Sequence, residues 1–127
     1  MPPSLFAKVN GRLHRIAVDE ILFAEADKHY IKIFTEKVSL YTHFTLGQLE
    51  SILPAEYFCR IHRSYIIAIH KIDSFDHEYV YIKDKQLNIS IQYFEILKSK
   101  VIIINDIKPT KVISIENTLP NLSFVHK

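Results

Sequence analysis

The sequence predicts a mainly β fold with two short helices. Short runs rich in β-branched and aromatic residues recur along its 127 residues, as half-buried strands prefer. Polar turns separate these runs, and only two segments, 45–54 and 90–101, place apolar residues at helical spacing. The length, a hydrophobic content of 48% and a charged content of 24% are typical of one globular domain.

Strand-like runs alternate with turns in the N-terminal part of the chain. Asn10-Gly11 supplies the positive φ angles of a type I′ turn, so residues 5–16 are expected to form a β-hairpin. A second pair of strands, 21–26 and 30–34, flanks a polar corner, and residues 38–42 follow as a further strand.

The first helix is predicted between Thr45 and Leu53. Thr45 with Gln48 forms a capping-box pattern, in which each side chain bonds the backbone N–H of the other residue. Leucines then recur at helical spacing. Pro54 disfavours helical geometry at the residue before it, so the helix should end at Leu53.

The C-terminal part is predicted to hold further strands and the second helix. Residues 79–83 and 86–90 have strand character on either side of a tight polar turn. Ser90 can cap the second helix, and one more strand is expected at 111–115. The apolar stripe of the second helix is expected to comprise Phe94, Leu97 and Val101.

Motifs of the common enzyme classes are absent from the sequence. It contains no glycine-rich phosphate loop, no GxSxG elbow and no HExxH motif. Its seven histidines are scattered, and only Cys59 with His62 approaches the spacing of metal ligands, whereas structural zinc needs two such pairs. We therefore expect no catalytic activity, no cofactor, no small-molecule substrate and no metal, and a buried, reduced Cys59. Acids that can still meet in space, though solvated positions are commoner for them, are Asp19, Glu20, Glu25 and Asp27.

The sequence also predicts a cytoplasmic protein with no membrane association. No basic segment precedes a long apolar stretch at the start of the chain, and the longest apolar runs are far shorter than the ~20 residues of a membrane span. A net charge of +2 is compatible with a nucleic-acid partner but does not indicate one by itself.

The central stretch FCRIHRSYII, residues 58–67, concentrates basic side chains. No acid occurs between Arg60 and Lys71. In one continuous strand, Arg63 would share its face with apolar neighbours and be buried, so the chain is expected to bend at residues 62–64. An exposed Arg63 can grip a phosphate or bind guanine in the major groove, and Ser64 suits a phosphate contact. The alternative is that Arg60 pairs with an acid inside the β-layer and His62 is a core histidine with its hydrogen bonds satisfied.

This stretch closely resembles the signature of the LytTR DNA-binding domain. The resemblance includes residues 57–72, YFCRIHRSYIIAIHKI, and extends in order over residues 21–35, 45–54 and 87–101. It covers the chain from about Leu5 to Ile104.

The resemblance implies an elongated arrangement of small antiparallel β-sheets. It also implies sequence-specific binding of double-stranded DNA by loops placed in successive major grooves. The chain would then be the output domain of a bacterial transcription regulator of the two-component response type. Its partner would be promoter DNA with direct repeats, and a homodimer on DNA is compatible with this. The DNA-binding residues that the resemblance implies, from three loops, are Lys28, His29 and Tyr30; Arg60, His62, Arg63 and Ser64; and Ser90 and Gln92.

The sequence departs from the family pattern at two positions. Gln92 stands where an arginine is usual, so this contact carries no charge and can favour adenine. Ala68 stands where an asparagine is common. We expect residues 1–105 to form the DNA-binding domain and residues 106–127 a C-terminal extension. The chain has no room for a receiver domain, and residues 5–16 resemble the segment that often follows one, so we expect that a receiver has been removed or lost.

A protein-interaction module without DNA binding is the alternative function. Exposed edge strands can pair with a partner strand. A tyrosine patch formed by Tyr79, Tyr81 and Tyr93 can add to such an interface. Salt separates the two functions, because DNA binding weakens steeply as salt rises and an apolar interface barely responds.

Overall fold

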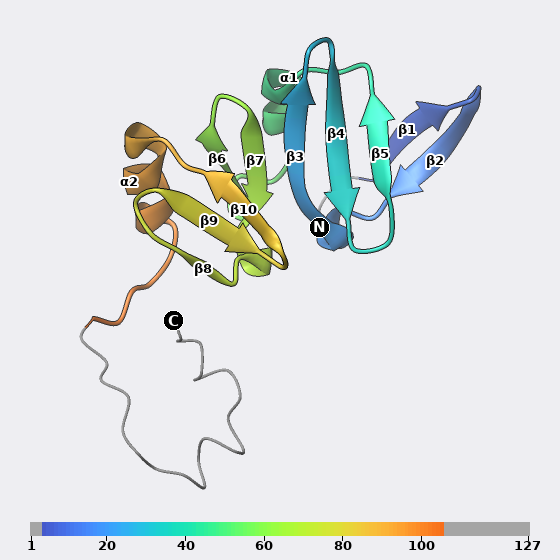
Figure 1. Cartoon of the computed structure of the whole chain (residues 1–127). Helices are drawn as coiled ribbons and strands as arrows, with labels where there is room; N and C mark the ends of the chain where they lie inside the picture. Colours follow the sequence, from blue (N-terminus) through green and yellow to red (C-terminus); the bar gives the residue numbers. More distant parts are fainter. Residues whose placement is uncertain (1–3, 106–127) are drawn as a thin grey trace, which may run out of the picture.

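The computed structural model describes residues 4–105, in which three small antiparallel sheets and two α-helices form an elongated arrangement (Figure 1). The mainly β class and the two helices are therefore confirmed. The strand expected at 111–115 and the extension 106–127 lie outside the described residues. Within residues 4–105, neither α-helix has the length and apolar character that crossing a membrane requires.

The first sheet is the predicted hairpin. Strands β1 (Leu5–Val9) and β2 (Arg12–Ile16) pair in register on either side of Asn10 and Gly11. Both turn residues have positive φ, 52° and 78°, as a type I′ turn requires.

The second sheet has five strands in the order β5-β4-β3-β7-β6. A 3-10 turn (η1, Val18–Glu20) leads into it from the hairpin. Because α1 carries the chain from the β5 edge to the opposite edge, β7 pairs with β3, which lies far from it in sequence (Figure 1). The strands are β3 (Ile21–Asp27), β4 (Tyr30–Thr35), β5 (Ser39–Thr42), β6 (Phe58–His62) and β7 (Tyr65–Ala68).

Helix α1 (Leu46–Ile52) begins and ends where the sequence predicts. The Thr45 hydroxyl accepts from the Gln48 N–H at 3.0 Å, and the Gln48 side-chain oxygen accepts from the Thr45 N–H at 2.9 Å. This is the expected capping box. Leu53 has extended geometry before Pro54 and ends the helix.

The third sheet follows a second 3-10 turn (η2, Ile69–Lys71) and has the order β10-β9-β8. Its strands are β8 (Ser74–Phe75), β9 (Tyr79–Ile82) and β10 (Lys85–Asn88). Strands β9 and β10 start or end one or two residues from the predicted positions, whereas no bounds were predicted for β8.

Two details of the second helix differ from the sequence-based expectation. Helix α2 spans Ile91–Ser99, so Val101 lies beyond it and only Phe94 and Leu97 of the predicted stripe belong to the helix. Ser90 occupies the N-cap position, but its side chain makes no capping hydrogen bond. Its backbone carbonyl begins the helix instead, by accepting from the N–H groups three and four residues later.

The five-stranded sheet is covered on both faces, which explains its long apolar runs. One face packs against α1 and the β1–β2 hairpin, through residues such as Ile33 and Leu49. The other face packs against α2 and the third sheet, through residues such as Ile61 and Leu97. Cys59 is buried on this second face as a free thiol, as predicted, and burial raises its pKa.

Candidate nucleic-acid interface

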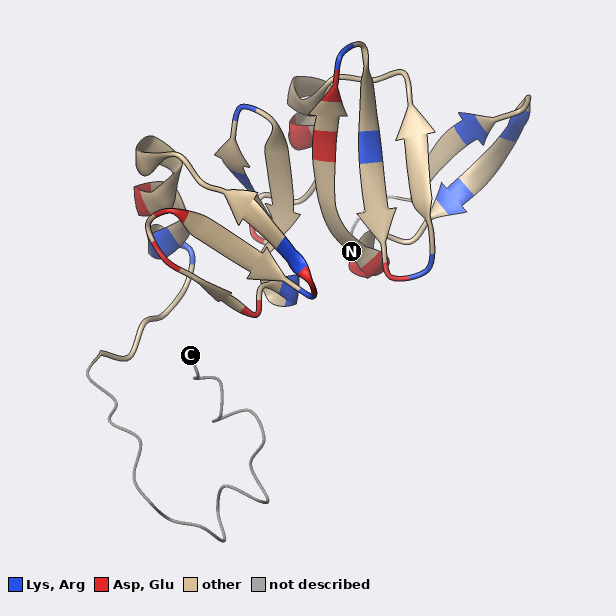
Figure 2. Ribbon diagram, in the orientation of Figure 1, with Lys and Arg blue, Asp and Glu red and all other residues tan. Residues whose placement is uncertain are grey.

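The basic stretch forms a tight turn at one end of the five-stranded sheet. Strands β6 and β7 are joined by Arg63 and Ser64 alone, so the predicted bend at residues 62–64 is confirmed. Arg63 is exposed on this turn, where Figure 2 shows a basic segment at the tip. Its guanidinium group is therefore open to an external partner.

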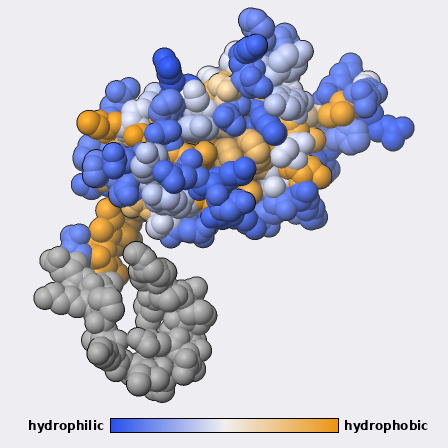
Figure 3. Space-filling view, viewed as in Figure 1, coloured by the Kyte–Doolittle hydropathy of each residue, from blue (hydrophilic) through white to orange (hydrophobic). Residues whose placement is uncertain are grey.

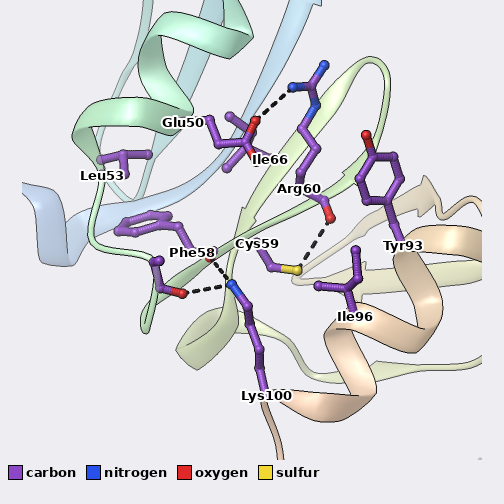
Figure 4. A pocket seen from close by; sticks show the side chains of 10 residues that line it. Glu50, Leu53, Phe58, Cys59, Arg60, Ile66, Tyr93, Ile96 and Lys100 are labelled. Atoms are coloured by element: carbon purple, nitrogen blue, oxygen red, sulfur yellow. Dashed lines mark hydrogen bonds and ion pairs between the residues drawn. The ribbon is translucent and has the colours of Figure 1, made fainter.

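Arg60 holds this turn from within the protein. Its Nε donates to the His62 carbonyl at 2.8 Å, and its Nη2 donates to the Arg63 carbonyl at 2.9 Å. Its Nη1 lies 3.1 Å from Glu50 Oε1 on α1, an ion pair drawn in Figure 4. The Arg60 side chain is only 19% exposed. Arg60 therefore pairs with an acid, as the alternative for this residue held, but the acid lies on helix α1 and is half exposed, not inside the sheet.

His62 fixes the same turn through its ring. The Ser64 N–H donates to His62 Nδ1 at 3.1 Å, which requires an unprotonated Nδ1 and leaves the ring proton on Nε2. Burial, followed by the nearby positive charges of Arg63 and Arg60, lowers the pKa of His62 below its usual 6.5. The neutral ring is therefore the form that matches this hydrogen bond.

We expect His62 to titrate below pH 6.5, and the Ser64 amide to report the same transition. The folded chain binds this proton less readily than the unfolded chain, so the free energy of unfolding falls as pH drops below about 6.5. NMR titration of the His62 ring and the Ser64 amide measures both signals. A His62 midpoint at or above pH 6.5 would contradict the expectation.

The first predicted loop is the turn between β3 and β4. Asp27 pairs with Tyr30 across the turn, which leaves Lys28 and His29 as the two turn residues. Lys28 has a φ of 61°, and all three predicted residues of this loop are exposed. The Tyr30 ring lies 5.2 Å from the ring of His43.

A backbone hydrogen bond ties these two turns together. The Ala26 N–H donates to the Ser64 carbonyl at 2.9 Å, immediately before β3 ends. Figure 1 shows the β3–β4 and β6–β7 turns projecting from the same end of the sheet. The structure therefore brings His29 and Arg63 to one side of the molecule.

The third predicted region joins the same side through β6. The Ser90 N–H donates to the Ile61 carbonyl at 2.9 Å, so α2 begins beside the end of β6. Gln92 is exposed in the first turn of α2. In Figure 1 the β3–β4 turn, the β6–β7 turn and the start of α2 follow one another along this side of the molecule.

Glu50, the acid that pairs with Arg60, was not predicted from the sequence. No motif indicates this contact, because it joins a helix to a strand ten residues later in the chain. Among residues 4–105, no group of three or more His, Cys, Asp or Glu side chains has an arrangement that could hold a metal ion.

Several known proteins are similar to this chain. The family model of the LytTr DNA-binding domain matches residues 11–102. The chain is 34% identical over 71 residues to the transcriptional regulatory protein NatR of Bacillus subtilis, a match covering 56% of this chain and 30% of NatR. It is 34% identical over 55 residues to the CO-responsive transcriptional regulator RcoM of Rhodospirillum rubrum, covering 43% of this chain and 23% of RcoM. The matches thus span less than a third of these relatives.

A solved structure shows the same fold. A LytTr DNA-binding domain from Bacillus cereus superimposes with a TM-score of 0.66 at 17% sequence identity. The match covers 76% of this chain and 94% of the solved one.

Proposed function

This chain belongs to the LytTR family of DNA-binding domains, which is not an enzyme family, and from that premise we propose that it reads double-stranded DNA through three loops. The loops are the β3–β4 turn, the β6–β7 turn and the start of α2. We propose that they enter successive major grooves. The observation that carries this proposal is their alignment along one side of the molecule, maintained by two backbone hydrogen bonds.

Each loop offers exposed side chains suited to reading bases. Arg63 can donate two hydrogen bonds to guanine O6 and N7. Gln92 can bind adenine in a bidentate manner, and His29 can contact a base edge or a phosphate. The remaining contacts, to phosphate or sugar, are assigned to Lys28, Tyr30, Ser64 and Ser90.

Arg60 and His62 are assigned a different part in the same site. Three donor groups of Arg60 are already engaged within the protein, two of them by carbonyls of the turn. His62 accepts the Ser64 N–H of that turn. Both residues therefore act by fixing the direction in which Arg63 projects, which reduces the cost of ordering Arg63 on DNA.

The wider setting is proposed from the relatives. NatR and RcoM are named as transcriptional regulators, which supports promoter DNA as the target of this domain. We place the domain as the output part of a two-component response regulator. On direct repeats, two copies would bind one helical turn or a multiple of it apart, because each must face the same side of the duplex.

Selection from a randomised duplex library tests the proposed function directly. We expect purified domain to enrich a repeated motif and to bind it with an affinity that falls steeply as salt rises. Failure to enrich any sequence, with weak binding that ignores salt, would contradict DNA reading and favour the protein-interaction alternative.

A further inference from the structure

The β1–β2 hairpin carries the positive charge that the remainder of the described domain lacks. Residues 4–18 contain Lys8, Arg12 and Arg15 and no acid. Residues 19–105 contain ten Lys and Arg against twelve Asp and Glu, a formal charge of −2. Without the hairpin, the domain would therefore be repelled by DNA at long range.

Acids also lie close to the proposed reading turns. Glu25 pairs in register with Tyr65, beside the β6–β7 turn, and Asp27 immediately precedes Lys28. Their charges offset those of Lys28 and Arg63 at this end of the sheet. The two turns therefore bring little net positive charge to the DNA backbone, and a further basic surface would strengthen phosphate binding.

The basic side chains of the hairpin are available to an external partner. Lys8, Arg12 and Arg15 are all exposed. None of them forms an ion pair with another residue in the described part of the chain. Figure 2 shows basic segments on both hairpin strands and no acidic segment.

Pairing within the hairpin places these charges on both of its faces. Arg15 lies opposite Phe6, and Arg12 lies opposite Val9 on the other face. The Arg15 guanidinium stacks 4.8 Å from the centroid of the Phe6 ring, which holds it near the hairpin surface.

The hairpin is anchored at its base and free at its tip. Ala7 and Ile16 are buried against the main core, whereas the residues around the Asn10-Gly11 turn are exposed. In Figure 1 the hairpin extends beyond β5, and its tip points to the same side as the β3–β4 and β6–β7 turns. Figure 3 shows a largely hydrophilic surface there.

We propose that the β1–β2 hairpin is a phosphate-binding arm. It grips the DNA backbone beyond the base pairs that the β3–β4 turn reads, and it contributes affinity without sequence preference. The inference rests on the proposed function, because it extends the same interface along the duplex. We infer that DNA is the partner of this arm because the charges are complementary. A duplex carries a dense row of phosphates, and the arm offers three cations that form no ion pair within the described residues.

The test replaces the three cations of the arm together, in the variant K8Q/R12Q/R15Q. We expect the slope of log affinity against log salt to become shallower by about 1 per lost phosphate contact. We also expect affinity at low salt to fall by about tenfold or more, in the same proportion for the selected site and for a scrambled duplex. Hydroxyl-radical footprinting should show loss of backbone protection on one flank of the site only.

A matched control distinguishes the loss of hairpin contacts from a general effect of lower net charge. K37Q/K83Q/K85Q removes the same formal charge from exposed positions in or beside the β4–β5 and β9–β10 turns. It should retain both the salt slope and the flanking footprint. The single variant R12Q provides a smaller perturbation, with a slope change of about 1.

Two outcomes would contradict the proposal that the hairpin is a phosphate-binding arm. One is that K8Q/R12Q/R15Q binds DNA with the affinity, salt slope and footprint of the wild type. The hairpin would then not contact DNA, and an acidic protein surface would be the next partner to test. The other is an equal loss in the control variant, which would make the effect one of net charge alone. If wild-type protein selects no sequence at all, the proposed function itself fails, so the two failures are distinguishable.

Discussion

Replacing Arg63 by alanine is expected to lower affinity for the selected DNA site by ~1–3 kcal/mol, or roughly 5- to 150-fold. The side chain is exposed at the tip of the β6–β7 turn, and the bonds that hold the turn use its backbone carbonyl, which alanine retains. The fold should therefore be unaffected, and the loss should fall on sequence recognition. Fluorescence anisotropy titrations against the selected site and a scrambled duplex measure both affinities.

Arg63→Lys shows whether the planar fork of arginine is needed. Lysine keeps the charge but does not reproduce the bidentate geometry. It should bind the scrambled duplex about as tightly as wild type does, while recovering little of the preference for the selected site. If Arg63→Ala binds the selected site as tightly as wild type does, Arg63 is not a base-reading residue.

Replacing Arg60 by alanine is expected to damage both stability and DNA recognition. The change removes two hydrogen bonds to turn carbonyls and leaves Glu50 without its cation. Hydrogen bonds that involve a charged group contribute ~1.5–3 kcal/mol, so a loss of this order in the free energy of unfolding is expected. Denaturant unfolding measures the stability, and anisotropy titration measures the preference for the selected site.

Glu50→Gln is the matched control for Arg60→Ala. Glu50 is 52% exposed in its side chain, so removing its charge should cost less than ~1 kcal/mol and leave the turn in place. The salt slope then distinguishes the two possible roles of Arg60. Positioning predicts an unchanged slope together with weaker discrimination between sites, whereas a phosphate contact predicts a slope shallower by about 1.

Local signals in the sequence predicted much of this structure. The Asn10-Gly11 turn and the capping box of Thr45 with Gln48 depend only on near neighbours, and both form as expected. The bend at residues 62–64 followed from a similar argument, since a continuous strand would have buried Arg63. Elements defined by contacts within a few residues are therefore accessible from sequence alone.

Contacts between distant segments were not accessible in this way. The pairing of β3 with β7, the ion pair of Arg60 with Glu50 and the bond from Ser90 to Ile61 join separate parts of the chain. No local spacing encodes them. The Ser90 side chain also lacks the cap that its position suggested, because residue type indicates a capacity for hydrogen bonding and not its use. The resemblance to a family, and not the pattern of residues, placed the three loops in one site.

The pairing of β3 with β7 has a consequence for how the domain folds. The β3–β4 and β6–β7 hairpins each close a short loop, so each can form quickly and independently. The β3–β7 ladder instead closes a loop that contains β4, β5, α1 and β6, and the entropy lost in closing it must be offset before the two hairpins align. In an intermediate that has both hairpins but not the β3–β7 ladder, the two turns would have no fixed position relative to each other. Competence to discriminate DNA sequences should therefore require the β3–β7 ladder and not the two hairpins alone.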